Sequence, residues 1–375
     1  MPEPPPHRTR LLTVAGHLGA VGGSEVAQLR VVDGLASDGW EVELIYTSAG
    51  DLWPQWRALA TRARAVGATQ FERGALVRSG LGCARTLVES VRSGAEVVYL
   101  HNPGDLEVAL AASRLARVPV VVHLHLPPPS RQHPWLHRLI RHADARIAPS
   151  HDAARRWADV VGLPVAACTV IPTGIDGGRF APLGATERAA HRRALGLDPD
   201  RPLVLYAGRI DPTKGIDVLA DALSAMATPA HLALCGPVSD AGYADRLRHQ
   251  LGAAGATWLG QRREVAHLLA SADLVVLPSL VPETQGLVVS EAMSCGVPAV
   301  ASRIGGLPEA LAGFPDHLFP PGDASALSVL LDRLIDWRRE RPDLGPAGRS
   351  WVSGHLGLDA TVGAVSSLLQ VVGRH

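Results

Sequence analysis

The feature that most constrains the fold of this chain is an alternation of short apolar runs with helical patterns, which occurs twice along its length. Runs rich in Val, Ile and Leu precede stretches with apolar residues at helical spacing, a pattern typical of βα units and parallel sheets. The predicted strands are Leu11–Ala15, Glu41–Tyr46, Val97–Leu100, Val118–Leu124, Ala145–Ala148, Leu203–Ala207, His231–Cys235, Thr257–Leu259, Leu274–Leu277 and Val297–Ala301. The sequence therefore predicts an α/β protein of two doubly wound domains in tandem, whose strand ends would line a cleft.

Helices are predicted between these strands. The first has Ser24 as its N-cap and an apolar face of Val26, Leu29, Val32 and Leu35. In the second half we expect helices over residues 217–227 and 264–271. Between the halves, residues 172–200 are rich in Gly, Pro and charge, and we interpret them as a connecting segment with a short helix.

Composition excludes several classes of protein. The 375 residues carry a formal net charge of +0, whereas a nucleic-acid binder usually has a basic face. The four cysteines are far apart and are expected to be free, buried thiols in a reducing compartment. The N-terminal residues MPEPPPHRTR lack the apolar core of a signal peptide, and no run approaches the ~20 apolar residues of a membrane span. We expect a cytoplasmic protein.

Two cations follow the predicted strand Leu203–Ala207. They are Arg209 and Lys214, and Lys214 is the only lysine among 36 Lys and Arg residues. Because the sequence otherwise uses arginine, a chance surface cation here is expected to be arginine too. Arginine binds phosphate in a bidentate way, and lysine acts as a compact point charge. The pair predicts a diphosphate site, with two solvated turn residues as the alternative.

A pair of glutamates surrounds a predicted helix start. Glu283 lies in a loop, Glu291 lies inside the following helix, and Gly286 stands between them. A helix start offers unpaired backbone N–H groups to an anion. Glu291 could accept hydrogen bonds from ribose hydroxyls, and Glu283 could reach a second polyol. Such glutamate pairs also occur without a ligand.

A glycine-rich turn, AGHLGAVGGSE, leads from the first strand into the first helix. Gly22 and Gly23 would allow a phosphate to approach the backbone at the helix N-terminus. A tight turn that needs small residues is the alternative. The spacing is not the G-x-G-x-x-G of a dinucleotide site.

The segment VVHLHLPPP places His123 and His125 on one face of a strand end, and His101 ends another strand. A metal site would need a third ligand at a suitable spacing, which the sequence does not supply. We therefore predict a polar cluster and no metal. The default for one of the two neighbouring histidines is a core position.

Three ordered segments, VIPTGIDGGRFAP, YAGRIDPTKGIDVLADAL and PETQGLVVSEAMSCGVPAVAS, resemble the signatures of retaining glycosyltransferase family 4. The resemblance covers nearly the whole chain, with Thr173 where asparagine is usual. It implies the GT-B fold of two Rossmann-like domains. Residues 1–180 would form the acceptor domain, helix 357–375 would pack back on it, and residues 181–356 would bind the nucleotide-sugar donor.

The resemblance also assigns roles. Arg209 and Lys214 would hold the diphosphate and offset charge on the leaving nucleotide, and Glu291 would bind the ribose. Glu283 would position the transferred sugar. It would act together with the backbone N–H groups of residues Gln285, Gly286, Leu287 and Val288.

Other roles fall on residues of both halves. Gly22 and Gly23 would touch the phosphate, and His125 would contact the donor sugar near its C6 hydroxyl. Arg262 would lie near the base. Gln285 replaces the usual phenylalanine, which leaves its side-chain contact undefined. The predicted catalytic residues are His125, Glu283, Arg209 and Lys214.

The resemblance implies transfer of a sugar from an NDP-sugar. We expect a hexosyl or aminohexosyl unit and a small soluble acceptor such as a cyclitol or natural-product aglycone. UDP is the preferred nucleotide, and guanosine and adenosine donors stay open as alternatives. Retention by a front-face mechanism needs no metal, and we identify no Asp-x-Asp as a metal–diphosphate anchor. The alternatives are a GT-B sugar-nucleotide epimerase, a lipid acceptor, and a sugar-nucleotide-binding protein without catalysis. A monomer or homodimer is expected, without nucleic acid or stable membrane insertion.

Overall fold

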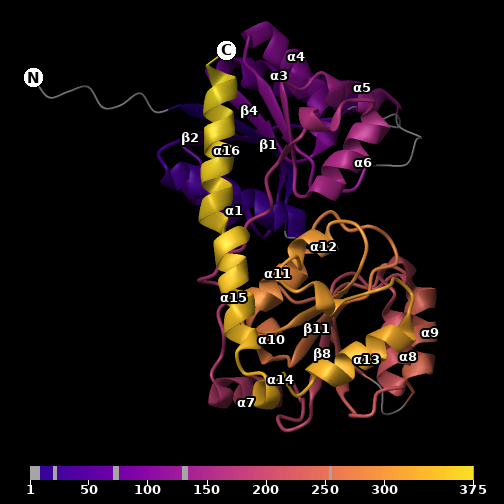
Figure 1. Cartoon of the computed structure of the whole chain (residues 1–375). Coiled ribbons are helices and arrows are strands. Elements are labelled where there is room, and N and C mark those ends of the chain that lie inside the picture. The colour runs from indigo at the N-terminus through magenta and orange to yellow at the C-terminus, as the bar shows by residue number, and fades with distance from the viewer. Residues whose placement is uncertain (1–8, 20–22, 71–75, 129–133, 253–255, 375) are drawn as a thin grey trace, which may run out of the picture. The chain divides into compact units, whose positions relative to one another are not determined.

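The computed structural model describes residues 9–19, 23–70, 76–128, 134–252 and 256–374. The chain divides into two compact units (Figure 1): unit 1 is residues 1–174 with 358–375, and unit 2 is residues 175–357. The boundary between residues 174 and 175 lies a few residues before the boundary that was predicted at residue 180. The physical reason is that Ile175 and Phe180 are buried in the core of unit 2.

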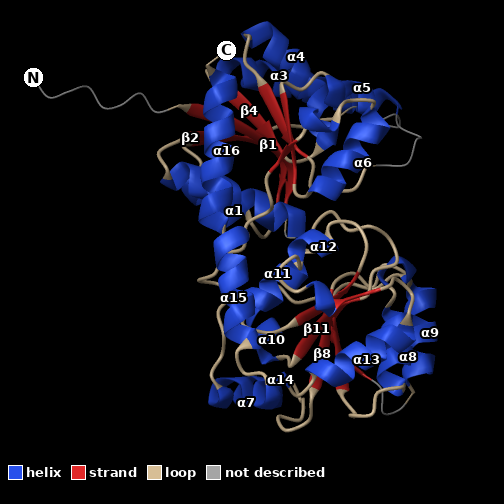
Figure 2. Cartoon of the chain, viewed as in Figure 1, coloured by secondary structure: helices blue, strands red, loops and turns tan. Residues whose placement is uncertain are grey.

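Unit 1 is a parallel sheet with helices on both faces (Figure 2). Within the described ranges its strand order is β3-β2-β1-β4-β5-β6-β7. The strands are β1 (Arg10–Leu18), β2 (Glu41–Ala49), β3 (Arg62–Ala65), β4 (Val97–Leu100), β5 (Val120–His123), β6 (Ala145–Ala148) and β7 (Thr169–Val170). The helices are α1 (Gly23–Ser37), α2 (Trp53–Leu59), α3 (Leu76–Arg92), α4 (Leu106–Ala116), α5 (Pro134–Arg141), α6 (His151–Val161) and α16 (Leu358–Gly373). The order reverses between β1 and β4, and doubly wound sheets bind ligands at the carboxyl ends of strands beside such a reversal.

Both faces of this sheet are buried, which explains why its strands are visible in the sequence as apolar runs. On one face of the sheet, the side chains that include Leu11 pack against α1, α2 and α16. On the other face, the side chains that include Leu12 pack against α4, α5 and α6. Neighbouring residues of one strand therefore belong to two separate cores.

Helix α16 packs on unit 1. Val362, Val365 and Leu369 are buried in the core that also contains residues of α1 and β1. The indole Nε1 of Trp40 donates to Ser366 Oγ at 3.0 Å. Figure 1 shows this helix lying along the unit with its end near β4.

Unit 2 repeats the architecture. Its strand order, for the residues that are described, is β10-β9-β8-β11-β12-β13, all parallel. The strands are β8 (Leu203–Ala207), β9 (His231–Cys235), β10 (Ala256–Gly260), β11 (Leu274–Leu277), β12 (Ala299–Ser302) and β13 (Leu318–Phe319). The helices are α7 (Ala185–Ala194), α8 (Ile216–Ser224), α9 (Ala241–Leu251), α10 (Ala266–Ser271), α11 (Leu287–Ser294), α12 (Leu307–Ala310), α13 (Ala324–Leu334), α14 (Trp337–Glu340) and α15 (Leu344–His355). Here the reversal lies between β8 and β11.

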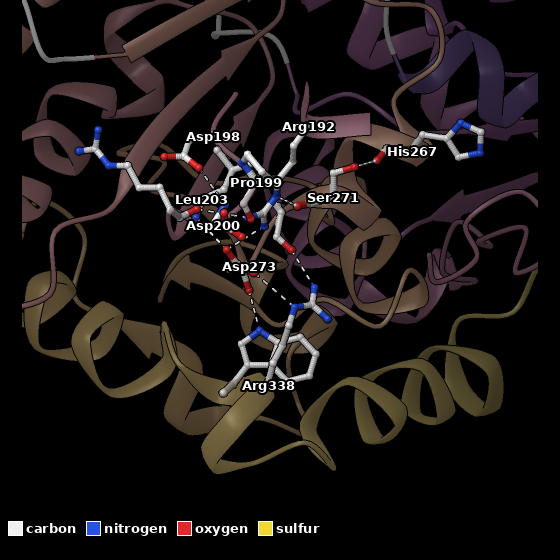
Figure 3. Close-up of polar contacts among 12 residues, drawn as sticks. Arg192, Asp198, Pro199, Asp200, Leu203, His267, Ser271, Asp273 and Arg338 are labelled. Atoms are coloured by element: carbon white, nitrogen blue, oxygen red, sulfur yellow. Dashed lines mark hydrogen bonds and ion pairs between the residues drawn. The ribbon is translucent and has the colours of Figure 1, made fainter. Parts of the chain in front are cut away.

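A buried ion pair joins the amino ends of β8 and β11 to α7 (Figure 3). The carboxylate of Asp273 accepts from Arg192 Nη2 at 2.8 Å and from the backbone N–H of Leu203 at 2.8 Å. Arg338 Nε donates to its other oxygen at 3.3 Å. Arg192 also donates to the carbonyl of Ser271 at 2.8 Å. These contacts fix the starts of the two strands whose far ends carry the candidate site.

Some expectations for single elements were wrong. Ser24 does not cap α1, because that helix already begins at Gly23 and the Ser24 hydroxyl donates to Glu25 Oε2 at 2.9 Å. The short strands β3, β7 and β13 were not predicted. Strand β3 has the sequence RARA, without an apolar run, and the other two contain two residues each.

The four cysteines are free and buried, as predicted. Over the described residues, no helix combines the length and apolar character needed to cross a membrane.

Candidate functional site

The centre of the candidate site in unit 2 is an ion pair between Lys214 and Glu283. Lys214 Nζ lies 2.6 Å from Glu283 Oε1, and both side chains are mostly buried. The hydroxyl of Ser279 donates to the same carboxylate oxygen at 2.5 Å. The structure thus brings together two residues that the sequence assigned to different parts of a donor, the diphosphate and the sugar.

A tight turn after β8 carries Lys214 to this position. Asp211 caps the turn by accepting from the Thr213 N–H at 3.0 Å, and Gly215 ends it with a φ of 61°. A Cβ on Gly215 would lie 2.2 Å from the Pro278 carbonyl oxygen, so the turn packs directly on the loop after β11. The Leu280 N–H donates to the Thr213 carbonyl at 2.8 Å. Only a glycine allows this approach.

The backbone of Glu283 is fixed by the loop after β12. The Gly306 N–H donates to the Glu283 carbonyl at 2.8 Å. A Cβ on Gly305 would lie 2.4 Å from that carbonyl oxygen. Loops from three adjacent strands, β8, β11 and β12, therefore position one carboxylate.

Helix α11 begins next to this ion pair. Gly286 is its N-cap, with a φ of 79°, and a Cβ there would lie 2.3 Å from Leu307 Cδ2. Leu287 and Val288 are half-buried. Because they form the first turn of α11, their backbone N–H groups point out of the N-terminal end of the helix. The side chain of Gln285 is buried. That burial places the Gln285 side chain in the interior of unit 2.

The two predicted arginines differ in position. Arg209 follows β8, and its side chain is 61% exposed, with Nη1 3.5 Å from Asp211 Oδ2. It is therefore available to an incoming anion. Arg262 follows the edge strand β10 and donates to the Leu259 carbonyl of its own turn at 3.1 Å. Strand β9 separates β10 from β8, so the structure does not bring Arg262 to the ion pair.

Glu291 lies in α11, inside the predicted ribose-binding helix, and is half-buried. Burial raises the pKa of its carboxyl from the ordinary 4.5 to about 7. Glu264 also raises this pKa, and Arg179 lowers it. Arg179 and Glu264 pair with each other at 3.4 Å.

This shifted pKa predicts a pH dependence of stability. Between pH 4.5 and about 7 the folded protein retains a proton that the unfolded chain has lost. The free energy of unfolding contributed by this group therefore falls as the pH rises through that window. We expect the unfolding midpoint of the wild type to fall relative to that of Glu291→Gln, which does not ionise. Thermal unfolding of both proteins across this window measures it, and parallel curves would contradict the shifted pKa.

In unit 1, Gly23 is the exposed first residue of α1. It follows β1, one of the two strands beside the reversal of strand order. Its backbone is therefore placed where a doubly wound sheet accepts an anion. Gly22 lies outside the described residues.

Three buried histidines gather at the carboxyl ends of β4 and β5. His101 Nδ1 lies 2.9 Å from His125 Nε2, and the rings of His123 and His125 stack with centroids 3.8 Å apart. Tyr99 Oη lies 2.8 Å from His123 Nδ1, and Thr173 Oγ1 lies 3.4 Å from His125 Nδ1. Burial lowers the pKa of all three imidazoles, that of His125 to about 4, so each is neutral near pH 7.

The three histidines bring their ring nitrogens close together, but the rings of His123 and His125 are not oriented to share a metal ion. One nitrogen from each ring lies within 4.8 Å of the others. However, the ring planes of His101 and His125 are 8° apart and those of His123 and His125 are 21° apart. The rings of His123 and His125 are stacked face to face, so their in-plane lone pairs do not converge on one point, whereas His101 and His125 lie edge to edge with Nδ1 and Nε2 facing each other.

One sequence expectation needs correction. The chain does contain an Asp-x-Asp, Asp198-Pro199-Asp200. It stands in the turn before β8, where the Asp200 N–H donates to Asp198 Oδ1 at 2.9 Å (Figure 3). The turn lies at the amino end of the sheet, opposite the end that carries Lys214.

Sequence reasoning predicted a polar cluster of these histidines, which the structure brings together, but it missed Ser279 and the direct contact between His101 and His125. Ser279 directly follows Pro278 after β11, and a hydroxyl at the end of a strand beside the order reversal is the signal that could have identified it. For His101, the signal was its place at the end of β4, next to β5 in the sheet.

Comparisons with known proteins agree with this geometry. The family described as "Glycosyltransferase Family 4" matches residues 21–179, and the one described as "Glycosyl transferases group 1" matches residues 187–351. A D-inositol 3-phosphate glycosyltransferase of Xylanimonas cellulosilytica is 29% identical over 92% of this chain and 91% of its own length. The sulfoquinovosyl transferase SQD2 of Arabidopsis thaliana is 30% identical over 76% of this chain, which spans 59% of that protein.

Solved structures show the same fold. The crystal structure of Anabaena Alr3699/HepE with UDP and glucose aligns over 97% of this chain and 100% of its own, with a TM-score of 0.83 and 22% identity. The sucrose-phosphate synthase of Thermosynechococcus elongatus aligns over 97% of this chain and 99% of its own, with a TM-score of 0.78 and 22% identity. With matching family descriptions for both units, two Rossmann-like sheets and this structural likeness, the chain belongs to glycosyltransferase family 4 and is a transferase with the GT-B fold.

Proposed function

We propose that this glycosyltransferase moves a hexosyl unit from a UDP-sugar to a hydroxyl of a small soluble cyclitol, with retention and without a metal ion. The observation that carries the proposal is the ion pair of Lys214 and Glu283 at the β8–β11 reversal, beside the start of α11. A cation, a carboxylate and the backbone N–H groups of a helix start at one place suit an anionic ligand that also carries hydroxyls.

Charge and position suggest how donor groups are held. Lys214 and the exposed Arg209 accept the diphosphate, and Lys214 then exchanges its carboxylate partner for phosphate. Glu283, released by this exchange, accepts hydrogen bonds from sugar hydroxyls. Glu291 accepts from the ribose. His125 of unit 1 and Gly23 at the start of α1 take the sugar and phosphate contacts that the family resemblance assigns to them.

In the proposed front-face reaction, the acceptor oxygen bonds to the anomeric carbon on the face from which the phosphate leaves. The bond from that carbon to the phosphate oxygen breaks, and the acceptor's proton passes to the departing phosphate. The positive charges of Arg209 and Lys214 stabilise the developing negative charge, which is the electrostatic contribution that a metal would otherwise supply.

The cyclitol acceptor is supported by the relatives named D-inositol 3-phosphate glycosyltransferase, one of which matches the chain over nearly its full length. The test offers UDP-glucose, UDP-N-acetylglucosamine and UDP-galactose with inositol 3-phosphate, inositol, an aglycone panel and a lipid acceptor. We expect transfer to a cyclitol, undiminished by EDTA, with an α-linked product by NMR.

Each other outcome contradicts a defined part of the proposal. A β-linked product excludes retention, and loss of activity in EDTA that added metal restores excludes metal independence. Preferential transfer to the lipid or an aglycone excludes the cyclitol. Epimerised UDP-sugar without an acceptor would favour the epimerase.

A further inference from the structure

In the contact between His101 and His125, one of the two facing ring nitrogens has to carry the hydrogen. Both rings are buried, and their nitrogens lie 2.9 Å apart, a hydrogen-bond distance. Two neutral imidazoles can form this bond only if one nitrogen carries the hydrogen and the other offers its lone pair. The pair therefore has two possible arrangements.

The far side of the His101 ring distinguishes the two arrangements. His101 Nε2 is buried and has no hydrogen-bond partner in the part of the chain that the structure describes. If His125 were the donor, the hydrogen of His101 would sit on this Nε2, as a buried N–H without a partner. If His101 is the donor, only a lone pair is left unused there. Buried N–H groups without partners are rarer than under-used acceptors, which favours His101 as the donor.

We propose that His101 is a positioning residue, whose Nδ1–H donates to His125 Nε2 and so fixes the hydrogen of His125 on Nδ1. Neighbouring contacts support a fixed orientation. The His125 ring stacks on His123, and His123 is held by Tyr99 Oη at 2.8 Å from its Nδ1. Stacking thus holds the His125 ring in place, and the hydrogen bond from His101 sets its tautomer, as hydrogen bonds commonly do for histidine.

The fixed tautomer decides what His125 can do. Its Nδ1–H is directed to Thr173 Oγ1 at 3.4 Å, longer than the usual ~2.9 Å of an N–H···O bond. A sugar hydroxyl that approaches more closely is a better acceptor. With its Nε2 lone pair engaged by His101, His125 acts as a hydrogen-bond donor to substrate and not as a general base. This step rests on the proposed function.

The tautomer can be read directly by NMR, without any activity. Long-range ¹H–¹⁵N correlation on the full chain, labelled with ¹⁵N-histidine at neutral pH, separates protonated from unprotonated ring nitrogens. The His125 signals are assigned by their loss in His125→Phe. We expect a protonated Nδ1 and an unprotonated Nε2. A hydrogen on His125 Nε2 would overturn the proposal.

Variants of His101 test the cause. His101→Phe keeps a ring but removes the donor, so we expect the Nε2–H tautomer of His125 to appear. His101→Asn places an amide N–H where Nδ1 was and should restore the wild-type pattern. His231→Phe, which removes a histidine of unit 2, is the control and should leave the His125 signals unchanged. An unaltered tautomer in folded His101→Phe would also overturn the assignment.

Kinetics add an independent measurement. His101→Phe should lower kcat/KM by about tenfold, the upper range for one hydrogen bond. In a His125→Phe background the same change should have no further effect, because the two residues act together. Additive losses would contradict the coupling. If the chain transfers no sugar at all, the proposed function fails while the NMR result still decides the role of His101.

Discussion

Replacing Lys214 by alanine is expected to lower kcat/KM for sugar transfer by about 10²–10³-fold, the usual cost of removing one preorganised charge-stabilising group. The ammonium of Lys214 is held against Glu283 at the β8–β11 reversal, and its loss also leaves that mostly buried carboxylate without its cation. Steady-state transfer from the preferred UDP-sugar measures the effect. Stabilisation by UDP in a thermal shift should shrink as well, because it reports binding by mass action.

Two variants sharpen this prediction. Arg339→Ala removes a cation whose side chain is 77% exposed and should leave transfer unchanged. Lys214→Arg keeps the charge but introduces a larger planar group, and should retain only part of the activity. Full activity of Lys214→Ala would contradict the role of Lys214. Full activity of Lys214→Arg would mean that the single lysine of this sequence stands there by chance.

Replacing Asp273 by alanine is expected to destabilise unit 2 by about 3–5 kcal/mol, the usual cost of removing one member of a buried ion pair. Arg192 is almost fully buried and would lose its carboxylate, and the Leu203 N–H would lose its acceptor. Figure 3 shows the contacts of Arg192, Leu203 and Arg338 with the Asp273 carboxylate. Chemical denaturation followed by circular dichroism gives the free energy of unfolding.

The matched control is Asp245→Ala. Asp245 pairs with Arg248 at 2.7 Å, similar to the buried pair, but its side chain is 75% exposed. Exposed pairs contribute about 0–1 kcal/mol, so we expect a small change. Equal losses in the two variants would show that burial does not set the strength of the Asp273 interaction.

The order of elements was largely predictable because buried parallel strands have an unambiguous pattern. Strands β4, β6, β8, β9 and β11 have the predicted bounds. The predictions failed where the pattern is absent. Strand β3 alternates arginine with alanine, so its own residues do not predict a strand. It forms because its backbone pairs with β2 at the edge of the sheet.

The candidate site was predictable as residue types and less so as contacts. Glycine spacing and the unique lysine indicated the loops after β8 and β11. The bond between Lys214 and Glu283 was not predictable, because it depends on the close packing of the Gly215 turn against the Pro278 carbonyl. Similarly, His101 and His125 lie far apart in the sequence and meet only because β4 and β5 are neighbours.

The place of α16 has a consequence for synthesis on the ribosome. The strands of unit 1 are all made before residue 175, but the helix that covers one core face follows residue 357. Until then, the surface that receives Val362, Val365 and Leu369 has no cover from this helix. Unit 2, whose residues are continuous in the chain, can complete its core before unit 1 does. The first unit to emerge from the ribosome is therefore the last to be finished, and a chaperone that shields apolar surface has a defined period in which to act on it.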